Sequence, residues 1–105
     1  MAQIVWTEPA LLDLEEIAEY IALDKIDAAK RLVRKVFSST DRLEKFPESG
    51  RKPPELEDSR YREIIVGPCR IFYRVEKNIV FIIYVMRSER KLRKYLLDER
   101  SKESS

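Results

Sequence analysis

Residues 61–87 read YREIIVGPCRIFYRVEKNIVFIIYVMR. β-Branched and aromatic residues dominate this stretch, and two short turn sequences, Gly67-Pro68 and Lys77-Asn78, divide it into three runs. Such runs are typical of strands, and turns this short join neighbouring strands into hairpins. The stretch therefore predicts three consecutive antiparallel strands, over residues 60–66, 69–76 and 79–86.

Two-residue turns at both places would fix which side chains share a face of the sheet, because side chains alternate along a strand. One face is almost entirely apolar and is expected to pack on helices: Ile64, Val66, Cys69, Ile71, Tyr73, Val75, Val80, Ile82, Tyr84 and Met86. The other mixes arginines with aromatic residues and is expected to stay partly open: Tyr61, Glu63, Ile65, Arg70, Phe72, Arg74, Phe81, Ile83, Val85 and Arg87. A slip of one residue in either turn would exchange these assignments.

The N-terminal half predicts a short strand over residues 3–7 and then two amphipathic helices. Thr7 can cap the first helix, and Pro9 is tolerated in its first turn. The first helix is expected over residues 8–23, with an apolar stripe at three- and four-residue spacing: Leu11, Leu14, Ile17, Ala18 and Ile21. A break near residues 24–27 leads into a second helix that ends near Phe46. Two amphipathic helices joined by so short a turn are expected to form an antiparallel hairpin.

After the strands, Ser88 can cap a last helix that runs to Leu97. Residues 98–105 are polar and are expected to form a disordered tail. The predicted fold is α+β, with one domain over residues 1–97. An N-terminal strand and an antiparallel helical hairpin pack on a small antiparallel β-sheet, and a short C-terminal helix follows.

The composition is that of a globular domain with a heavily ionised surface, since 44% of the 105 residues are hydrophobic and 38% are charged. No apolar run approaches the roughly 20 residues that cross a bilayer. The first residues lack the basic region of a secretion signal. A single cysteine, Cys69, permits no intramolecular disulfide and fits a reducing compartment. We expect a cytoplasmic protein that does not enter a membrane.

The net charge of +2 conceals an uneven distribution of charge along the chain. Residues 1–24 contain six of the 19 acidic residues and no lysine or arginine, so the remainder carries 13 acidic against 21 basic side chains. This segregation has two interpretations. It is either a solvated surface without a role, or a basic patch for an anionic partner.

The order of elements resembles the RelE/ParE toxin superfamily over nearly the whole chain, from about Ile4 to Leu97. Five short motifs carry the resemblance through their order and spacing: Trp6-Thr-Glu-Pro-Ala10, Phe46-Pro-Glu-Ser-Gly-Arg51, Tyr61-Arg-Glu63, Cys69-Arg-Ile-Phe-Tyr-Arg74 and Val85-Met-Arg-Ser-Glu-Arg90. The resemblance implies a small bacterial toxin that a neighbouring antitoxin wraps and neutralises.

The superfamily divides by mechanism into RelE-like toxins, which cleave messenger RNA on the ribosome, and ParE-like toxins, which poison DNA gyrase. Where RelE-like enzymes carry an arginine before the second strand, this chain has Ile65 and Val66. The chain contains no histidine, and Tyr95 is out of register with the expected catalytic tyrosine. We therefore expect a gyrase poison. The alternatives are a nuclease, acting on ribosome-bound mRNA or directly on DNA, and a non-toxic relic that only binds its antitoxin.

Guanidinium groups suit the binding of phosphate and carboxylate, because their fork of donors matches those oxygens. The arginines expected to bind the target are Arg70, Arg74, Arg87 and Arg90. If the chain is a nuclease, its expected catalytic residues are Arg70, Arg87, Arg90 and Tyr95. We expect the arginines to converge on the open face of the sheet. The alternatives are a structural ion pair or stacking across the sheet for Arg70, and a solvated strand position for Arg74. For Arg87 and Arg90 the alternative is salt bridges, and for Tyr95 it is helix packing. No metal or other cofactor is expected.

Overall fold

The structure of the protein is a computed structural model that describes residues 1–56 and 58–103. These residues form, in chain order, β1 (Gln3–Trp6), α1 (Glu8–Ala22), α2 (Ile26–Asp41), β2 (Tyr61–Val66), β3 (Cys69–Glu76), β4 (Ile79–Arg87) and α3 (Lys94–Glu103). Short 3₁₀ turns lie at Arg42–Glu44 and Pro54–Leu56. The predicted α+β class is confirmed. None of the described helices combines the length and the apolar character that crossing a membrane requires.

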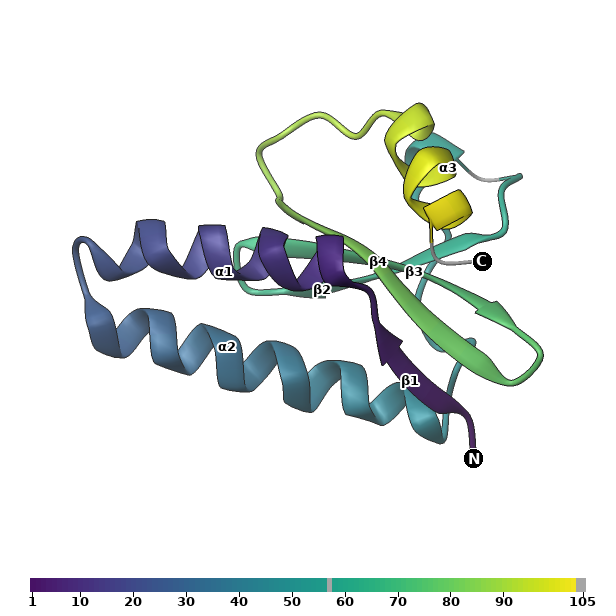
Figure 1. Cartoon of the computed structure of the whole chain (residues 1–105), viewed down its shortest axis with the longest axis horizontal. Helices are drawn as coiled ribbons and strands as arrows, with labels where there is room; N and C mark the ends of the chain where they lie inside the picture. Colours follow the sequence, from purple (N-terminus) through teal and green to yellow (C-terminus); the bar gives the residue numbers. More distant parts are fainter. Residues whose placement is uncertain (57, 104–105) are drawn as a thin grey trace.

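The two long helices lie side by side as the predicted antiparallel hairpin, and their joining turn extends well beyond the sheet (Figure 1). Thr7 caps α1 as expected, since its hydroxyl accepts a hydrogen bond from the Ala10 N–H at 3.4 Å. Both helices contribute buried apolar residues to the core that they share with the sheet: Ala10 and Leu14 in α1, and Leu32 and Val36 in α2.

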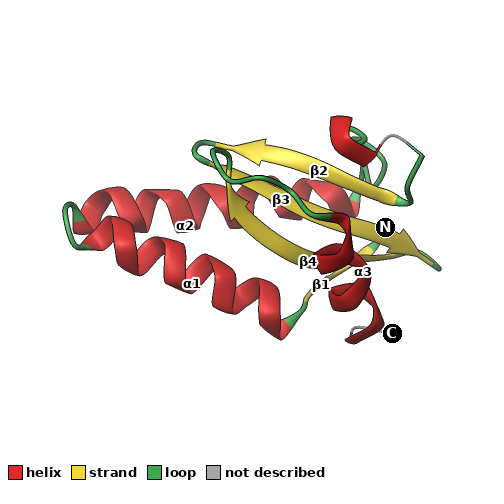
Figure 2. Cartoon of the chain, turned by 90° about the horizontal axis from the view of Figure 1, so that it is seen from above, coloured by secondary structure: helices red, strands yellow, loops and turns green. Residues whose placement is uncertain are grey.

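The sheet has the order β1-β4-β3-β2, which is seen from above in Figure 2. The two hairpin turns have two residues each, as predicted. Gly67, Lys77 and Asn78 adopt positive φ angles of 57°, 51° and 63°, the backbone that such tight turns need. The structure corrects one point of topology, because β1 pairs in parallel with β4. The sheet is therefore mixed, and not purely antiparallel.

The predicted faces are correct for β2, β3 and the first half of β4, but not for the end of β4. Phe72 pairs with Tyr84 and Tyr73 with Ile82, so Ile83 is an extra residue that forms a bulge. A bulge reverses the alternation that follows it. Tyr84 and Met86 consequently lie on the second face of the sheet, whereas the buried Val85 joins the helix-facing core.

The second face is not open, which corrects another expectation. Helix α3 covers it, and a second apolar cluster fills the space between them: Tyr61, Phe72, Ile83, Met86, Leu92 and Leu97. Helix α3 also begins and ends later than predicted, so residues 98–103 are helical and do not form a polar tail. Residues 104 and 105 lie outside the described residues.

Side-chain contacts explain why so polar a segment is helical. Tyr61 donates a hydrogen bond from its hydroxyl to Asp98 at 2.6 Å, and Arg60 donates to the Ser101 hydroxyl at 2.9 Å. Leu97 and Ser101 are fully buried. A helix of ten residues is marginal in isolation, whereas burial of one leucine contributes roughly 1.5–3 kcal/mol. Tertiary contacts therefore decide the position of α3.

Candidate functional site

Arg70 lies on the second face of the sheet, in a network of two arginines and two glutamates. Its guanidinium group lies 2.8 Å from a carboxylate oxygen of Glu55 and 2.5 Å from one of Glu63. Arg51 reaches the other oxygen of Glu63 at 2.8 Å. The side chain of Glu63 is fully buried, and that of Arg70 is 10% exposed. The guanidinium of Arg70 therefore already has two carboxylate partners within its own chain.

The network changes the pKa values of two of its members. The hydrogen bond from Arg70 lowers the pKa of Glu55 from 4.5 to about 2, against the opposing effect of partial burial. Glu55, followed by Glu63, raises the pKa of Arg70 above its ordinary value. Both shifts favour the charged forms, so the pair stays ionised at neutral pH.

Arg74 lies on the same face and is also buried, with 1% of its surface exposed. Its guanidinium forms an ion pair with Glu76 and lies over the ring of Phe81, 4.3 Å from the ring centroid. Arg70 likewise lies over the ring of Phe72, at 5.0 Å. Carboxylates and aromatic rings of the same chain therefore contact both arginines. The expectation that these two side chains are presented on an open face is wrong.

Arg87 lies on the opposite side, because the bulge in β4 turns it toward α1. Its guanidinium lies 5.2 Å from the ring centroid of Tyr20 and 2.7 Å from a carboxylate oxygen of Glu89. Arg87 and Arg90 line one hollow of about 520 Å³ between α1 and the end of β4. Asp13, Glu16, Tyr20 and Glu89 also line it. The structure therefore brings Arg87 and Arg90 together but separates them from Arg70 and Arg74, so the predicted convergence of four arginines is wrong.

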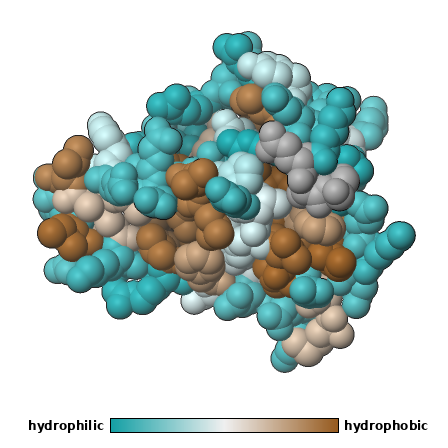
Figure 3. All heavy atoms as spheres, in the orientation of Figure 1, coloured by the Kyte–Doolittle hydropathy of each residue, from teal (hydrophilic) through white to brown (hydrophobic). Residues whose placement is uncertain are grey.

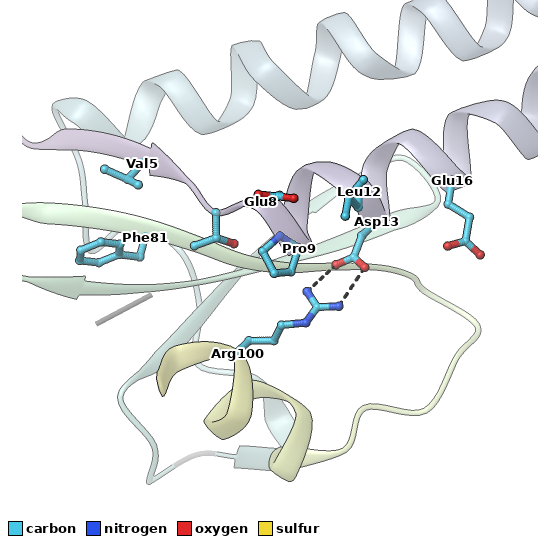
Figure 4. A pocket seen from close by; sticks show the side chains of 9 residues that line it. Val5, Glu8, Pro9, Leu12, Asp13, Glu16, Phe81 and Arg100 are labelled. Atoms are coloured by element: carbon cyan, nitrogen blue, oxygen red, sulfur yellow. Dashed lines mark hydrogen bonds and ion pairs between the residues drawn. The ribbon is translucent and has the colours of Figure 1, made fainter. Parts of the chain in front are cut away.

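A second hollow, of about 590 Å³, lies at the start of α1 (Figure 4). Val5, Leu12 and Phe81 contribute apolar walls, while Asp13 and Arg100 lie at its edge. Arg100 binds both carboxylate oxygens of Asp13, at 2.9 and 3.0 Å. Asp13 lines both hollows, so the ion pair lies where the two meet.

Asp13 and Arg100 also bond to the backbone of β4. Asp13 accepts a hydrogen bond from the Val85 N–H at 3.1 Å, and Arg100 donates one to the Ile83 carbonyl at 2.9 Å. These backbone groups lie beyond Ile82, the last residue of β4 that pairs with β1. Sequence analysis missed this pair. Its only signal was the opposite charge of the first helix and the C-terminal segment.

The surroundings of the tyrosines bear on proton transfer. Burial raises the pKa of Tyr61, Tyr73 and Tyr84 above the ordinary value of 10. Tyr95 is 60% exposed at the start of α3. The sequence has no histidine, which is the side chain whose ordinary pKa suits proton transfer near neutral pH. The described residues contain no group of three side chains suited to hold a metal ion.

Comparisons with known proteins agree with the architecture. Residues 4–92 match the family model described as the ParE toxin of the type II toxin-antitoxin system, parDE. Toxin RelE2 of Caulobacter vibrioides is 35% identical over 91 residues, which cover 86% of this chain and 99% of that protein. The putative toxin Y4kP of Sinorhizobium fredii is 36% identical over 77 residues, covering 73% of this chain and 79% of its own length.

A solved structure, the chromosomal ParDE TA system from P. aeruginosa, has the same fold with a TM-score of 0.71. The two chains are 24% identical, and the match covers 85% of this chain and 98% of the other. The predicted RelE/ParE resemblance is thus confirmed by sequence and by fold. The chain belongs to the ParE toxin family of type II toxin-antitoxin systems.

Proposed function

We propose that this toxin acts in the cytoplasm by binding DNA gyrase and blocking the resealing of cut DNA. The observation that supports binding over cleavage is the separation of the candidate arginines. Arg87 and Arg90 line a solvent-facing hollow, whereas Arg70 and Arg74 are buried in ion pairs on the other face of the sheet. The exposed ring of Tyr20 beside Arg87 adds an aromatic contact to the same hollow. Arginine and tyrosine are residues that protein interfaces favour.

Cleavage of RNA or DNA would use candidate residues that the structure holds apart, since Arg70 lies on the other face of the sheet from Arg87 and Arg90. Attack by a hydroxyl group requires a base, an acid, and cations that converge on the phosphate. The guanidinium of Arg70 is occupied by Glu55 and Glu63. Burial raises the pKa of Tyr84, which lines the hollow, and so makes this tyrosine a poorer proton donor at neutral pH. These features weigh against the nuclease alternative.

One experiment separates the candidate functions. Purified protein is incubated with gyrase and supercoiled plasmid, with plasmid alone, and with ribosome-bound mRNA. We expect cleaved plasmid that is trapped on gyrase, and no cleavage in the other two arms. Cleavage without gyrase, or cleavage of the mRNA, would contradict the proposal. Inactivity in every arm together with tight antitoxin binding would identify a non-toxic relic.

We further propose that an antitoxin binds the projecting end of the helical hairpin. The family description itself pairs the toxin with an antitoxin. Leu23 and Ile26 are 86% and 62% exposed near the turn of the hairpin, and apolar side chains gather at that end of the molecule (Figure 3, left). A hollow of about 430 Å³ runs along α2, with Ala29 and Val33 in its walls and with Lys30 and Arg34. Apolar walls beside two cations suit an amphipathic segment that carries acidic residues.

A further inference from the structure

The connection between β4 and α3 carries a dense positive charge. Residues 87–94 contain five basic side chains and one acidic one. Residues 88–93 form the long loop that leads from the end of β4 to α3 in Figure 1. Four cations that follow Arg87 are exposed: Arg90, Lys91, Arg93 and Lys94. In the described part of the chain, none of these four lies within ion-pair distance of a carboxylate. The charge of this loop is therefore available to a partner.

The loop is held in place by its backbone and by one apolar side chain. The Ser88 N–H donates a hydrogen bond to the Pro68 carbonyl at 2.7 Å, and the Arg90 N–H donates to the Arg87 carbonyl at 3.0 Å. Leu92, in the middle of the cations, is buried in the cluster under α3. A fixed backbone lowers the entropy that the loop would lose on binding.

The loop differs from the hollow beside it in the carboxylates that lie near its cations. Asp13, Glu16 and Glu89 line the hollow together with Arg87 and Arg90, whereas Lys91 and Arg93 are not among its lining residues. An acidic peptide in the hollow would meet those carboxylates. A row of phosphates that passes along the outer side of the loop would meet the exposed cations.

We propose that residues 90–94 form a contact site for the phosphate backbone of duplex DNA, without sequence specificity. Duplex DNA presents one phosphate per strand about every 3.4 Å of its axis, so several phosphates come within reach of one basic loop. Exposed lysine and arginine side chains supply this kind of contact, which positions a protein without reading bases. The inference rests on the proposed function, because it places the toxin against the DNA that gyrase holds.

Binding to DNA is measured without gyrase, so that the inference and the proposed function can fail separately. A fluorescently labelled 20-base-pair duplex is titrated with the purified full chain, and anisotropy gives Kd at about 50 to 200 mM KCl. We expect weak binding that loses affinity steeply as salt rises. The Lys91→Ala/Arg93→Ala variant is expected to bind about tenfold more weakly, with a log–log salt slope reduced by between about one and two.

The matched control removes the same charge elsewhere. Arg31 and Lys35 are exposed on α2, and the Arg31→Ala/Lys35→Ala variant is expected to change Kd by less than about threefold. The Lys91→Arg/Arg93→Lys variant should bind like the wild type, and circular dichroism with a thermal melt checks that each variant folds. Equal weakening in both alanine variants would mean that only net charge matters and would overturn the site. Absence of duplex binding by the wild type, or binding of an acidic peptide in its place, would overturn it as well.

The gyrase assay distinguishes the two failures. If the wild type traps gyrase on cut plasmid but does not bind the duplex, the DNA contact is wrong and the gyrase proposal stands. If it binds the duplex but traps no gyrase, the gyrase proposal is wrong and the DNA contact stands.

Discussion

Glu63 is a fully buried carboxylate that lies between the guanidinium groups of Arg51 and Arg70. A buried charge is tolerated only when it is paired and hydrogen-bonded. Both of its oxygens have arginine donors within 3.3 Å. The backbone of Glu63 also pairs with Arg51 on the outer edge of β2. The residue therefore joins the loop before β2 to the sheet through side chain and backbone together.

We predict that Glu63→Gln lowers the free energy of unfolding by about 3 kcal/mol, because removal of one partner leaves a buried guanidinium incompletely paired. The control is Glu55→Gln, whose carboxylate contacts the same arginine but is 42% exposed. Its loss is expected to be about 1 kcal/mol or less, because solvent screens the pair. Urea denaturation measures both values. Equal losses would show that burial of Glu63 has no special role.

The lowered pKa of Glu55 predicts a dependence of stability on acid. The pKa is about 2 in the folded chain and 4.5 without its partner, so the carboxylate stabilises the fold at pH above about 4.5. That contribution is lost as pH falls from about 4.5 to 2, because the unfolded chain then binds the proton more readily. Urea midpoints of wild type and Glu55→Gln, measured across this range, should converge at the acid end. A constant difference between them would contradict the prediction.

At the level of elements, the irregular end of β4 determines which residues face the solvent. The strand β1 stops pairing at Ile82, and the bulge at Ile83 follows directly. Beyond that point the carboxylate of Asp13 and the guanidinium of Arg100 bond to β4 where a neighbouring strand would otherwise continue. An ion pair between α1 and α3 thus satisfies backbone groups that a sheet edge would leave to water.

We predict that Asp13→Ala loosens α3 and the end of β4, because the Val85 N–H loses its side-chain acceptor and Arg100 keeps its bond to the Ile83 carbonyl but loses the carboxylate. The expected cost is about 1–3 kcal/mol of unfolding free energy, the usual penalty for a polar group left unsatisfied. Amide hydrogen exchange should accelerate at Val85 and along α3. Glu16→Ala, an exposed change on the same helix, should leave both measurements unaltered. Unchanged exchange at Val85 in the Asp13 variant would refute the role assigned to this carboxylate.

At the level of the whole molecule, the exposed apolar residues at the end of the hairpin, Leu23 and Ile26, are not among the residues that line the Arg87 hollow. The hairpin projects past the sheet and exposes apolar side chains at its end (Figures 1 and 3). The hollow that contains Arg87 and Arg90 lies between the C-terminal end of β4 and α1. We therefore expect that substitutions in the proposed antitoxin site and in the proposed target site can be made independently.

We predict that Leu23→Asp/Ile26→Asp weakens antitoxin binding by at least about tenfold, because two exposed apolar contacts become acidic. The fold should be unaffected, since neither side chain is buried. Isothermal titration with the cognate antitoxin measures the change. Phe46→Asp is the control, because Phe46 is 60% exposed but lies after α2, away from the hairpin turn. Equal effects from both variants would exclude the hairpin end as the specific contact.

We predict that Arg87→Ala/Arg90→Ala abolishes growth arrest on induced expression while the protein remains folded. Both side chains line the hollow assigned to the target, and neither is fully buried. The Arg31→Ala/Lys35→Ala variant removes the same charge from α2 and should remain toxic. Colony counts after induction, with soluble protein checked on gels, give the result. Full toxicity of the first variant would remove both arginines from the proposed site.

The sequence by itself determined the local structure of this protein. The spacing of apolar residues specified both long helices, and the Gly67-Pro68 and Lys77-Asn78 turns specified the three-stranded run, because these signals act within a few residues. The same motifs were sufficient to identify the toxin superfamily. Of the four arginines expected to converge, Arg87 and Arg90 line one hollow, and these two are close in the chain.

Only the tertiary structure decided which arginines reach solvent. The partners of Arg70 lie 7 and 15 residues away, and Asp13 lies 87 residues from Arg100, so no local pattern could reveal them. The bulge in β4 turned Arg87 to the helical side, and the packing of α3 closed the face that was expected to be open. Alternation along a strand assigns faces only while the pairing is regular. Where distant segments interrupt it, their contacts determine the surface.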